Sequence, residues 1–437
     1  MRDRFAAAAV LLTALGTVAG AQVPLGLETF DAAWQIVRDT HFDRTYNGVD
    51  WDAARAEFRP KAEAAKTPGE LRAVISSMLG RLGQSHFVIV PASADSTTDG
   101  SSGGGVVGEA DPGFDVRLIA DDLVVTRVDA GRGAAQAGVR PGWKLAAVAG
   151  KPMADVLRKL PKTSDERLRG FQAWRVAQAN LRGTPGSFVE LRFDDGVSKN
   201  GVKVDVERQR EQGVPVKVGS LPQMFVRVND EHKKTPGGRT AAVIGFNVWM
   251  AAVDSAFAKA IDKHRTADGI VIDLRGNPGG LAAMIMGVSG HFVPERKVLG
   301  VMKTRDNTLE FRTNPRLVDT AGQPVSAYGG PVAVLVDAMS GSASECFTGG
   351  MQSIGRVRVF GQTTMGQALP ALFDKLPNGD VMIHAYADFV TGDGTRLEGR
   401  GVVPDVPTPL VREDLLAGRD RALEAALDWI DGHSRKH

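Results

Sequence analysis

Apolar residues recur at intervals of three or four positions through residues 26–80, which is the spacing of amphipathic helices. Phe30, Trp34 and Val37 lie on one such stripe. The short run at residues 88–90 is entirely β-branched and predicts a strand. We therefore expect residues 22–91 to form a small helical domain that ends in this strand.

Short strands are predicted in the next part of the chain. Apolar and polar residues alternate in residues 114–118, and the same pattern returns in residues 188–193 and 202–206, as in strands with one buried face. Residues 154–181 return to a helical spacing. This pattern predicts a β-rich domain with a helical insertion.

Strands and helices alternate from residue 241 to residue 412, which predicts a sheet covered by helices. The runs 269–274 and 331–336 are apolar almost throughout, as expected of central strands. Residues 413–432 predict a terminal helix. At about 150 residues per domain, the 437 residues correspond to two or three domains.

The charge balance and the cysteine content limit which partners, disulfides and metal sites can be expected. Lys and Arg total 53 against 51 Asp and Glu, and this balance favours neither nucleic acid nor an anionic membrane as partner. The single cysteine, Cys346, excludes an internal disulfide. His and Cys residues are not clustered, so we expect no metal site and no other cofactor.

The first residues resemble a secretory signal. Arg2 and Arg4 precede an apolar run, and residues 19–21 form a small-x-small cleavage site. The apolar run of about 14 residues is short for a membrane-spanning helix, which needs ~20. We expect export to the periplasm or the medium, without stable membrane insertion after cleavage; an uncleaved anchor is the alternative. Residues 92–105 are rich in Ser, Thr, Asp and Gly and predict a flexible linker.

The segment after the apolar run 331–336 is rich in small residues and hydroxyls. A strand, tight turn and helix around Ser342 can expose one hydroxyl at the edge of a sheet and aim backbone N–H groups at a carbonyl oxygen. The alternative is an ordinary helix cap, in which Ser340, Ser342 or Ser344 caps the helix with Glu345 as partner.

A second turn follows the apolar run 269–274. It reads Asp273-Leu274-Arg275-Gly276-Asn277-Pro278-Gly279-Gly280. Glycines allow a backbone N–H to approach a ligand without a side chain in the way. The alternative is a plain strand-to-helix turn.

Together these turns resemble peptidase family S41, which comprises the tail-specific (C-terminal processing) proteases and the tricorn core. Two further motifs occur in the family's order, Gly361-x-x-Thr364-x-Gly366 and Glu398-Gly399-Arg400-Gly401-Val402-Val403-Pro404-Asp405. The resemblance covers roughly residues 70–410. It implies that Ser342 is the nucleophile of a serine endopeptidase, with an oxyanion hole from the N–H of Ala343 and of Gly279 or Gly280.

One position departs from the tail-specific branch. That branch activates its serine with a lysine 25 residues further on, and here that residue is Gln367. A glutamine amide cannot accept the proton, so a Ser–Lys dyad at this position is excluded. Gln367 is instead a candidate for binding the substrate backbone.

The tricorn-type branch uses a Ser-His pair and a Glu, and Ser85, His86 and Glu398 stand at the matching places. The implied relay runs from Glu398 through Ser85 and His86 to Ser342. An imidazole titrates near neutral pH and suits a general base. Two alternatives remain: a Ser85-His86 pair with no catalytic part, and a base elsewhere, with His384 as the main rival.

Residues 104–152 resemble the circularly permuted PDZ domain of this family. Ala137-Gly138-Val139 and Pro141-Gly142-Trp143 follow its pattern, with Trp143 in place of the usual Asp. PDZ domains bind a free C-terminus as an added strand, and Gly104 and Gly105 mark the candidate carboxylate loop. The alternative is a PDZ-shaped spacer that binds no ligand.

The resemblance implies a multidomain α/β protein with polypeptide substrates, which bind through free C-termini if the PDZ-like domain is functional, and no nucleic acid. Its last α/β part would have the ClpP/crotonase-type fold. The second hypothesis is a catalytically inactive peptide-binding protein on the same scaffold, and Gln367 is the feature that favours it. The expected order is a signal peptide (1–21), a helical domain (22–91), a linker (92–105), a PDZ-like domain (106–215) with a helical insertion (154–182), a protease core (220–412) and a C-terminal helix (413–437).

Overall fold

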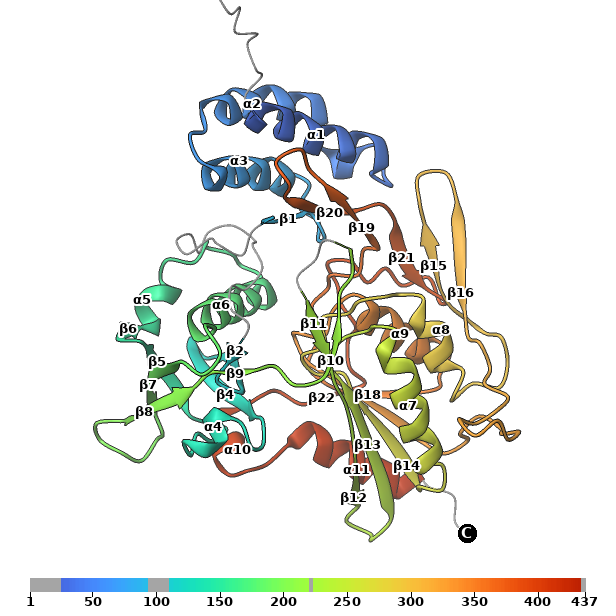
Figure 1. Ribbon diagram of the computed structural model, residues 1–437. Helices are drawn as coiled ribbons and strands as arrows, with labels where there is room; N and C mark the ends of the chain where they lie inside the picture. Colours follow the sequence, from blue (N-terminus) through green and yellow to red (C-terminus); the bar gives the residue numbers. More distant parts are fainter. Residues whose placement is uncertain (1–24, 93–109, 220–222, 434–437) are drawn as a thin grey trace, which may run out of the picture.

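The computed structural model describes residues 25–92, 110–219 and 223–433. The described chain is a multidomain α/β protein with an amino-terminal helical layer, a β-rich middle module and a larger α/β unit (Figure 1). The predicted signal peptide, Gly104, Gly105 and all but the first residue of the predicted linker lie outside the described residues.

Three helices form the amino-terminal layer: α1 (Leu25–Thr40), α2 (Trp51–Ala64) and α3 (Pro68–Gly80), with the short turn η1 (Tyr46–Gly48) after α1. The Asp50 side chain caps α2 by accepting from an amide of its first turn, and Thr67 caps α3 in the same way. The apolar stripes of the three helices bury Phe30, Trp34 and Ile75 in one core.

Residues from far along the chain complete this layer. Strand β1 (Val88–Val90) pairs with β20 (Val381–Ala385), which pairs with β19 (Ala371–Lys375). Met382 packs into the helical core. The helical layer therefore rests on strands that the sequence analysis assigned to the protease core, and Figure 1 shows these strands directly beneath α1 and α3.

The middle module has an antiparallel sheet in the order β3-β4-β5-β7-β8, and α6 packs across β3. The helical spacing predicted over 154–181 corresponds to two helices, which a break separates. Pro161 and the cap residue Asp165 lie in the break, where the chain leaves helical geometry. The module's elements are β2 (Ala110–Asp111), β3 (Phe114–Ile119), β4 (Asp122–Val128), α4 (Gly133–Gln136), β5 (Lys144–Val148), β6 (Lys151–Pro152), α5 (Met153–Leu157), α6 (Glu166–Leu181), β7 (Phe188–Asp194), β8 (Val202–Glu207) and β9 (Gln209–Arg210). The next strand, β10 (Val214–Val216), lies outside the module, and its Val216 packs against the core of the α/β unit.

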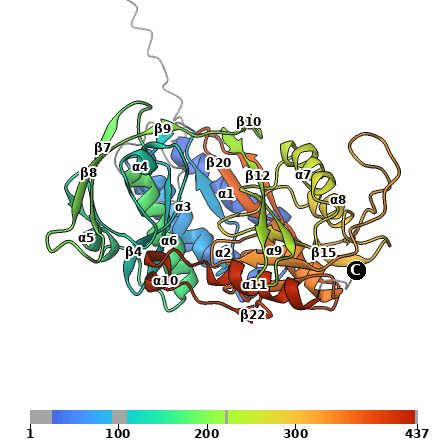
Figure 2. The ribbon, with the colours of Figure 1, turned by 90° about the horizontal axis from the view of Figure 1, so that it is seen from below.

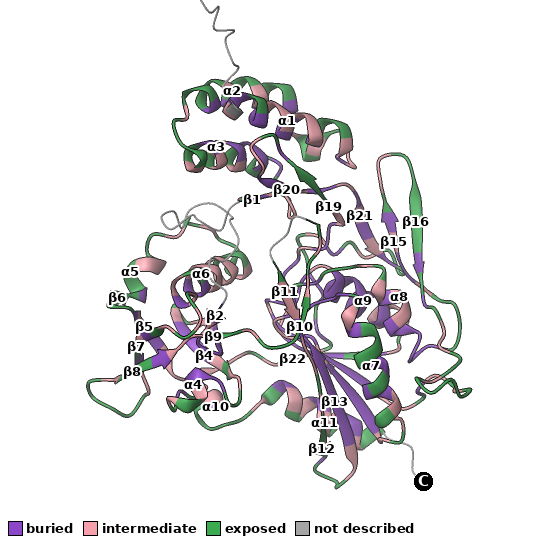
Figure 3. Cartoon of the chain, viewed as in Figure 1, coloured by how far each residue is buried: buried purple, intermediate pink, exposed green. Residues whose placement is uncertain are grey.

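The α/β unit is built on a six-stranded sheet in the order β12-β13-β14-β17-β18-β22. All of its strands are parallel except β12, which pairs antiparallel with β13. The central strands are buried on both faces, as Figure 3 shows in purple. The strands are β12 (Val228–Lys234), β13 (Thr240–Phe246), β14 (Gly269–Asp273), β17 (Val332–Val336), β18 (Arg358–Gly361) and β22 (Val406–Pro407).

Helices cover both faces of this sheet, and Figure 2 shows the layers from below. On one face α7 (Ala252–Lys263), α8 (Met284–Ser289) and α9 (Ala343–Ser353) share a core with alternate sheet residues. On the other face α11 (Arg421–His433) packs against the sheet residues that point to that side, including Leu335. The alternation predicted from residue 241 onward is thus confirmed as a helix-covered sheet.

The remaining elements lie around this unit. The strand β15 (Val298–Lys303) pairs with β16 (Thr308–Arg312) and β21 (Asp388–Thr391), and β11 (Met224–Val226) pairs with β10. The chain ends in two helices, α10 (Arg412–Leu416) and α11, rather than the single helix predicted for 413–432. Gly418 interrupts them with a φ of 69°, a left-handed conformation that glycine adopts without strain.

The sheet order brings two turns together. Strands β14 and β17 are parallel neighbours with a register that places Asp273 beside Leu335. The turn after β14 and the turn after β17 therefore leave the same edge of the sheet side by side, where ligands of open α/β sheets usually bind.

Candidate active site

Ser342 occupies a strained turn at the carboxyl end of β17. Its φ of 52° and ψ of −117° lie in a region that non-glycine residues rarely adopt, at a cost of about 1–3 kcal/mol. The residue is half-buried and stands immediately before α9. A serine in a strained conformation between a strand and a helix is the arrangement of a nucleophile elbow.

Glu345 holds this turn from beneath. Its side chain is fully buried and accepts four hydrogen bonds: from Thr364 Oγ1 at 2.5 Å, Gly366 N at 2.7 Å, Gln367 N at 2.9 Å and Ser342 N at 3.0 Å. Burial raises the pKa of the Glu345 carboxyl to about 7, although the four donors oppose the shift. The carboxyl therefore joins the serine turn to the segment around Gln367.

The second turn lies against the first. A Cβ placed on Gly279 would approach Ser342 Cβ to 2.5 Å and Ala343 N to 2.9 Å, so only glycine fits at this position. The buried Asn277 joins the turns, because its main-chain oxygen accepts from Gly341 N and from Ser344 Oγ, both at 3.0 Å.

Some backbone N–H groups of these turns donate a hydrogen bond within the protein, and others do not. Gly279 N donates to Asn277 Oδ1 at 3.0 Å. Within the part of the chain that the structure describes, Gly280 N and Ala343 N donate to no other protein group. Gly280 is exposed, and Ala343 follows Ser342 directly. Of the two glycines expected as donors, Gly280 is the one whose amide is unoccupied.

Ser85, His86 and Glu398 form one hydrogen-bonded group. Ser85 Oγ lies 2.7 Å from His86 Nδ1 and donates to Glu398 Oε2 at 2.9 Å, while Ser85 N donates to Glu398 Oε1 at 2.8 Å. His86 has a φ of 60°, a second strained non-glycine residue in this region. The sequence separates the two parts of this group by more than 300 positions, and the pairing of β1 with β20 brings them together.

The environment shifts the pKa of both titratable members. Desolvation lowers the pKa of the His86 imidazole to about 4, although part of the residue surface stays accessible. Burial raises the pKa of the Glu398 carboxyl above its usual range, against its hydrogen bonds from Ser85 and Ala368. Near neutral pH the imidazole is thus neutral and able to accept a proton.

The hydrogen bonds also select a tautomer of His86. With Glu398 ionised, Ser85 Oγ donates its only proton to the carboxylate and must accept from His86 Nδ1–H. The other ring nitrogen, Nε2, then carries the free lone pair. No described protein group is hydrogen-bonded to this nitrogen.

Main-chain bonds connect this group to the serine turn. Ser342 N donates to the oxygen of Gln367 at 2.9 Å, and Ala368 N donates to Glu398 Oε2 at 3.0 Å. The adjacent residues Gln367 and Ala368 therefore contact the Ser342 turn and the Glu398 carboxylate. Gln367 is half-buried, and its hydrogen bonds to other described residues are made by its main chain.

His384, the rival base, is engaged elsewhere. Its ring is fully buried, with Nδ1 3.0 Å from Thr40 Oγ1 and Nε2 2.7 Å from Asp374 Oδ2. Both nitrogens are used in joining β20 to α1 and β19. This arrangement favours a structural role for His384.

Neither a metal-binding cluster nor a membrane-spanning helix is present among the described residues. No cluster of three or more His, Cys, Asp or Glu side chains is arranged there to hold a metal ion. None of the helices in the same part of the chain combines the length and the apolar character that crossing a bilayer requires. Gly104 and Gly105, the expected carboxylate-binding loop, lie outside the described residues.

From the sequence, Glu345 was a candidate only for helix capping, and no motif indicated the roles of Asn277 and of the Gln367–Ala368 main chain. The spacing Ser342-x-x-Glu345 was visible, but a capping pair has the same spacing. A hydrogen bond made by main-chain atoms does not depend on which side chain the residue carries, so the sequence does not reveal it. These connections could be found only in three dimensions.

Comparison with known families agrees with this geometry. Residues 240–408 match the model of peptidase family S41, and residues 27–80 match the tricorn protease C1 domain. The first match contains both turns and Glu398, whereas Ser85 and His86 lie between the two matches.

Relatives of known name include carboxyl-terminal-processing peptidase 3, chloroplastic, of Arabidopsis thaliana, which is 24% identical over 396 residues, covering 86% of this chain and 68% of the relative. A Staphylococcus aureus protein named "Probable CtpA-like serine protease" is 25% identical over 287 residues, covering 65% of this chain. The chain spans half the length of that relative.

Solved structures share the fold. The photosystem II D1 C-terminal processing protease superposes with a TM-score of 0.56 at 20% identity, covering 91% of this chain and 98% of the other. Mature CPAF superposes with a TM-score of 0.58 at 15% identity, covering 93% and 97%. The matched model identifies residues 240–408 as a peptidase S41 domain, and together with the relatives it identifies the protein as a serine-type peptidase.

Proposed function

We propose that this protein hydrolyses peptide bonds through an acyl-enzyme on Ser342, with His86 as the general base. In the first step Ser342 Oγ attacks the scissile carbonyl carbon while its proton passes to His86 Nε2. The C–N bond then breaks, and the protonated imidazole returns this proton to the leaving amine. Water hydrolyses the ester by the same route and restores Ser342.

The hydrogen-bonded group Ser85–His86–Glu398 carries this proposal. Its bonds leave Nε2 as the acceptor, and the Glu398 charge stabilises the imidazolium that forms during each step. Ser85 transmits this effect, because it lies between the carboxylate and the ring. A Ser–Lys dyad is not required, and Gln367 at the lysine position is compatible with this chemistry.

The oxyanion hole in this proposal consists of Ala343 N–H and Gly280 N–H. Both amides are unoccupied among the described residues, and Gly279 packs against Ser342 between them. The amino terminus of α9 adds the positive end of its dipole at the same place. One such donor contributes about 3–4 kcal/mol to catalysis in typical mutagenesis.

The substrate class follows from the relatives and from the middle module. We propose an exported enzyme that acts on polypeptides, with the middle module binding a free carboxyl end in the manner of a PDZ domain. The antiparallel sheet of the module and the short helix α4 support this assignment. Substrates with a free C-terminus should then be cleaved faster than the same peptides with an amidated end. Equal rates for the two would contradict the role of the module.

The second candidate is a peptide-binding protein without catalysis, as Gln367 first suggested. A fluorophosphonate probe separates the two functions, because it forms a phosphonyl ester only with an activated serine. We expect labelling of the parent protein at Ser342 and none in Ser342→Ala or His86→Ala. An unlabelled parent at high probe concentration would favour the binding protein.

A further inference from the structure

Two arginines of the middle module contact the turns of the active site. Arg117 belongs to β3 and Arg167 to α6, and both lie outside the residues that match family S41. Each arginine contacts a different part of the site and shares no hydrogen-bond partner with the other.

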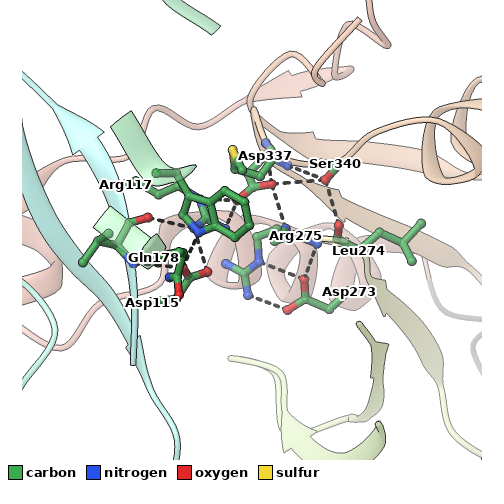
Figure 4. A network of polar contacts seen from close by, with 12 residues as sticks. Asp115, Arg117, Gln178, Asp273, Leu274, Arg275, Asp337 and Ser340 are labelled. Carbon is green, nitrogen blue, oxygen red and sulfur yellow. Dashed lines mark hydrogen bonds and ion pairs between the residues drawn. The ribbon is translucent and has the colours of Figure 1, made fainter. Parts of the chain in front are cut away.

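Arg117 contacts the turns that carry the oxyanion donors. Its Nε and Nη2 donate to Asp337 Oδ2 at 3.1 and 3.0 Å. The other oxygen of Asp337 accepts from Gly276 N at 2.8 Å and from Met339 N at 3.0 Å. Figure 4 shows Arg117 reaching across to Asp337, beside Ser340. Asp337 thus joins the start of the Gly279–Gly280 turn to the start of the Ser342 turn.

The Arg117 contact is buried and fully paired. Its side chain is 12% exposed and lies between two carboxylates, Asp115 at 2.7 Å and Asp337 at 3.0 Å. Burial alone would lower the pKa of Arg117, but the two carboxylates outweigh burial and raise it. Removal of the guanidinium would leave two buried carboxylates without their cation, which is costly.

Arg167 contacts the turns that carry the relay. Its Nη1 donates to the oxygens of Arg400 at 2.8 Å and of Thr364 at 3.1 Å, and its Nη2 donates to the oxygen of Gly399 at 2.8 Å. Gly399 follows Glu398 directly, and Thr364 Oγ1 donates to Glu345. One guanidinium therefore joins the turn of the relay carboxylate to the turn that contacts the serine loop.

The three carbonyl groups converge on a single point, so their dipoles repel one another unless a cation lies between them. Glycines shape these turns: Gly366, Gly399 and Gly401 all have φ values near 75°, a left-handed conformation that glycine adopts without strain. A planar guanidinium donates to three acceptors at once, and an ammonium group cannot match that fork. Arg167 is thus suited to fix these turns.

The elements that carry the two arginines, β3 and α6, are hydrogen-bonded to each other. Asp115 Oδ1 accepts from Trp174 Nε1 at 2.8 Å and from Gln178 Nε2 at 3.4 Å, which ties α6 to β3. A displacement of the module would therefore move Arg117 and Arg167 together.

From these contacts we infer that Arg117 and Arg167 are positioning residues for catalysis, Arg117 for the oxyanion turns and Arg167 for the Glu398 turn. The middle module is then part of the catalytic machinery as well as a candidate binding site. This inference rests on the proposed function. Neither arginine touches the reacting atoms, and each acts through the turn that it holds.

Arg412 offers a matched control. It also joins the middle module to the rest of the chain, donating from Nε to the oxygen of Gly142 at 2.8 Å and from Nη2 to the oxygen of Asp194 at 2.9 Å. It contacts neither catalytic turn. Arg412→Gln weakens the attachment of the module without removing a bond to the active site.

The experiment compares Arg167→Gln, Arg167→Lys, Arg117→Lys and Arg412→Gln with the parent. The readouts are the second-order rate of fluorophosphonate labelling from pH 3.5 to 9, kcat and KM on fluorescein-labelled casein, and Tm. We expect Arg167→Gln to reduce kcat and the labelling rate about 10- to 100-fold, as small misplacements of catalytic groups do, with KM little changed. The acid limb of its labelling profile should shift, and Arg167→Lys should restore part of the rate.

Arg117→Lys keeps the buried charge and should lower kcat without moving the acid limb, because it acts on the oxyanion turns rather than on the base. Arg412→Gln should lower Tm and leave the labelling rate within about twofold of the parent. If Arg412→Gln slows labelling as much as Arg167→Gln, the arginines only attach the module and the inference is overturned. Equal labelling of parent and Arg167→Gln overturns it while the proposed function stands, and an unlabelled parent overturns both.

Discussion

The amide of Ser342 donates to the main-chain oxygen of Gln367 over 2.9 Å. The next amide along, Ala368 N, donates to Glu398, so one two-residue segment touches both the Ser342 turn and the Glu398 carboxylate. Side chains at position 367 can vary while these main-chain bonds persist. The position that carries a lysine in the tail-specific branch is therefore structural here through its backbone.

Replacement of Gln367 tests whether its side chain has any function. Gln367→Ala preserves both main-chain contacts and should keep Tm within a few degrees of the parent. If the amide binds substrate backbone, KM should rise several-fold in both Gln367→Ala and Gln367→Lys. Unchanged kcat and KM in the two variants would show that the side chain does not contact substrate.

Replacement of Ser342 should separate activity from stability. Both Ser342→Ala and Ser342→Gly remove the nucleophile, so kcat/KM should fall by about ten-thousand-fold or more. Ser342→Gly should be the more stable of the two by about 1 kcal/mol, because glycine adopts a φ of 52° without strain. Urea unfolding of the two variants measures this difference, and a more stable alanine variant would contradict the strain at Ser342.

The acid limit of activity follows from His86. Burial lowers its pKa to about 4, so the neutral base is present above that pH and is lost as the pH falls through it. We expect the acid limb of kcat/KM to have its midpoint near pH 4 rather than near 6.5. A midpoint close to 6.5 would show that the imidazole is well solvated in the working enzyme.

Burial of Glu345 should make stability depend on pH. Its pKa is raised from 4.5 to about 7, so the folded state retains a proton that the unfolded state has released between these values. This group therefore contributes stability below pH 4.5 that is lost as the pH rises through 7. Glu345→Gln removes that dependence, and leaving buried donors unpaired should cost about 1–3 kcal/mol. Urea unfolding of parent and variant at pH 5 and 7 gives the comparison; parallel changes in the two would contradict the assignment.

Gly279 should tolerate no side chain. The added Cβ of Gly279→Ala would stand 2.5 Å from Ser342 Cβ, and the φ of 105° is strained for any L-residue. We expect at least a hundred-fold loss of labelling at Ser342, since displaced oxyanion donors cost about that much. Gly287→Ala in α8 is the control, because the nearest atom to its Cβ beyond the backbone of its own helix, Asp254 Oδ1, is 4.0 Å away. Similar losses in both variants would point to general destabilisation.

The sequence predicted the elements of the α/β unit well because its buried strands are long apolar runs with little ambiguity of period. The run 331–336 became β17, and the turns at Ser342 and Gly279 lie where the strand ends place them. Local breaks were harder to predict. The interruptions near Pro161 and Gly418 depend on single residues within otherwise helical spacing.

Contacts between distant segments were the least predictable part of the site. Composition gave no sign that β1 pairs with β20, or that α6 reaches the turn after Glu398. Family resemblance suggested Ser85, His86 and Glu398, and their hydrogen bonds are now described, whereas Arg117 and Arg167 lacked any motif. Long-range pairing is decided by the whole fold and leaves little signal in a local window.

The pairing of β1 with β20 also limits how early in synthesis the proposed active site can assemble. His86 lies two residues before β1, and the strand that anchors β1 is not complete until Ala385 has been synthesised. Before that point in translation, no partner strand holds β1, and with it His86, near the Ser342 turn. In the proposed mechanism, this pairing therefore cannot place His86 until residues up to Ala385 have been synthesised.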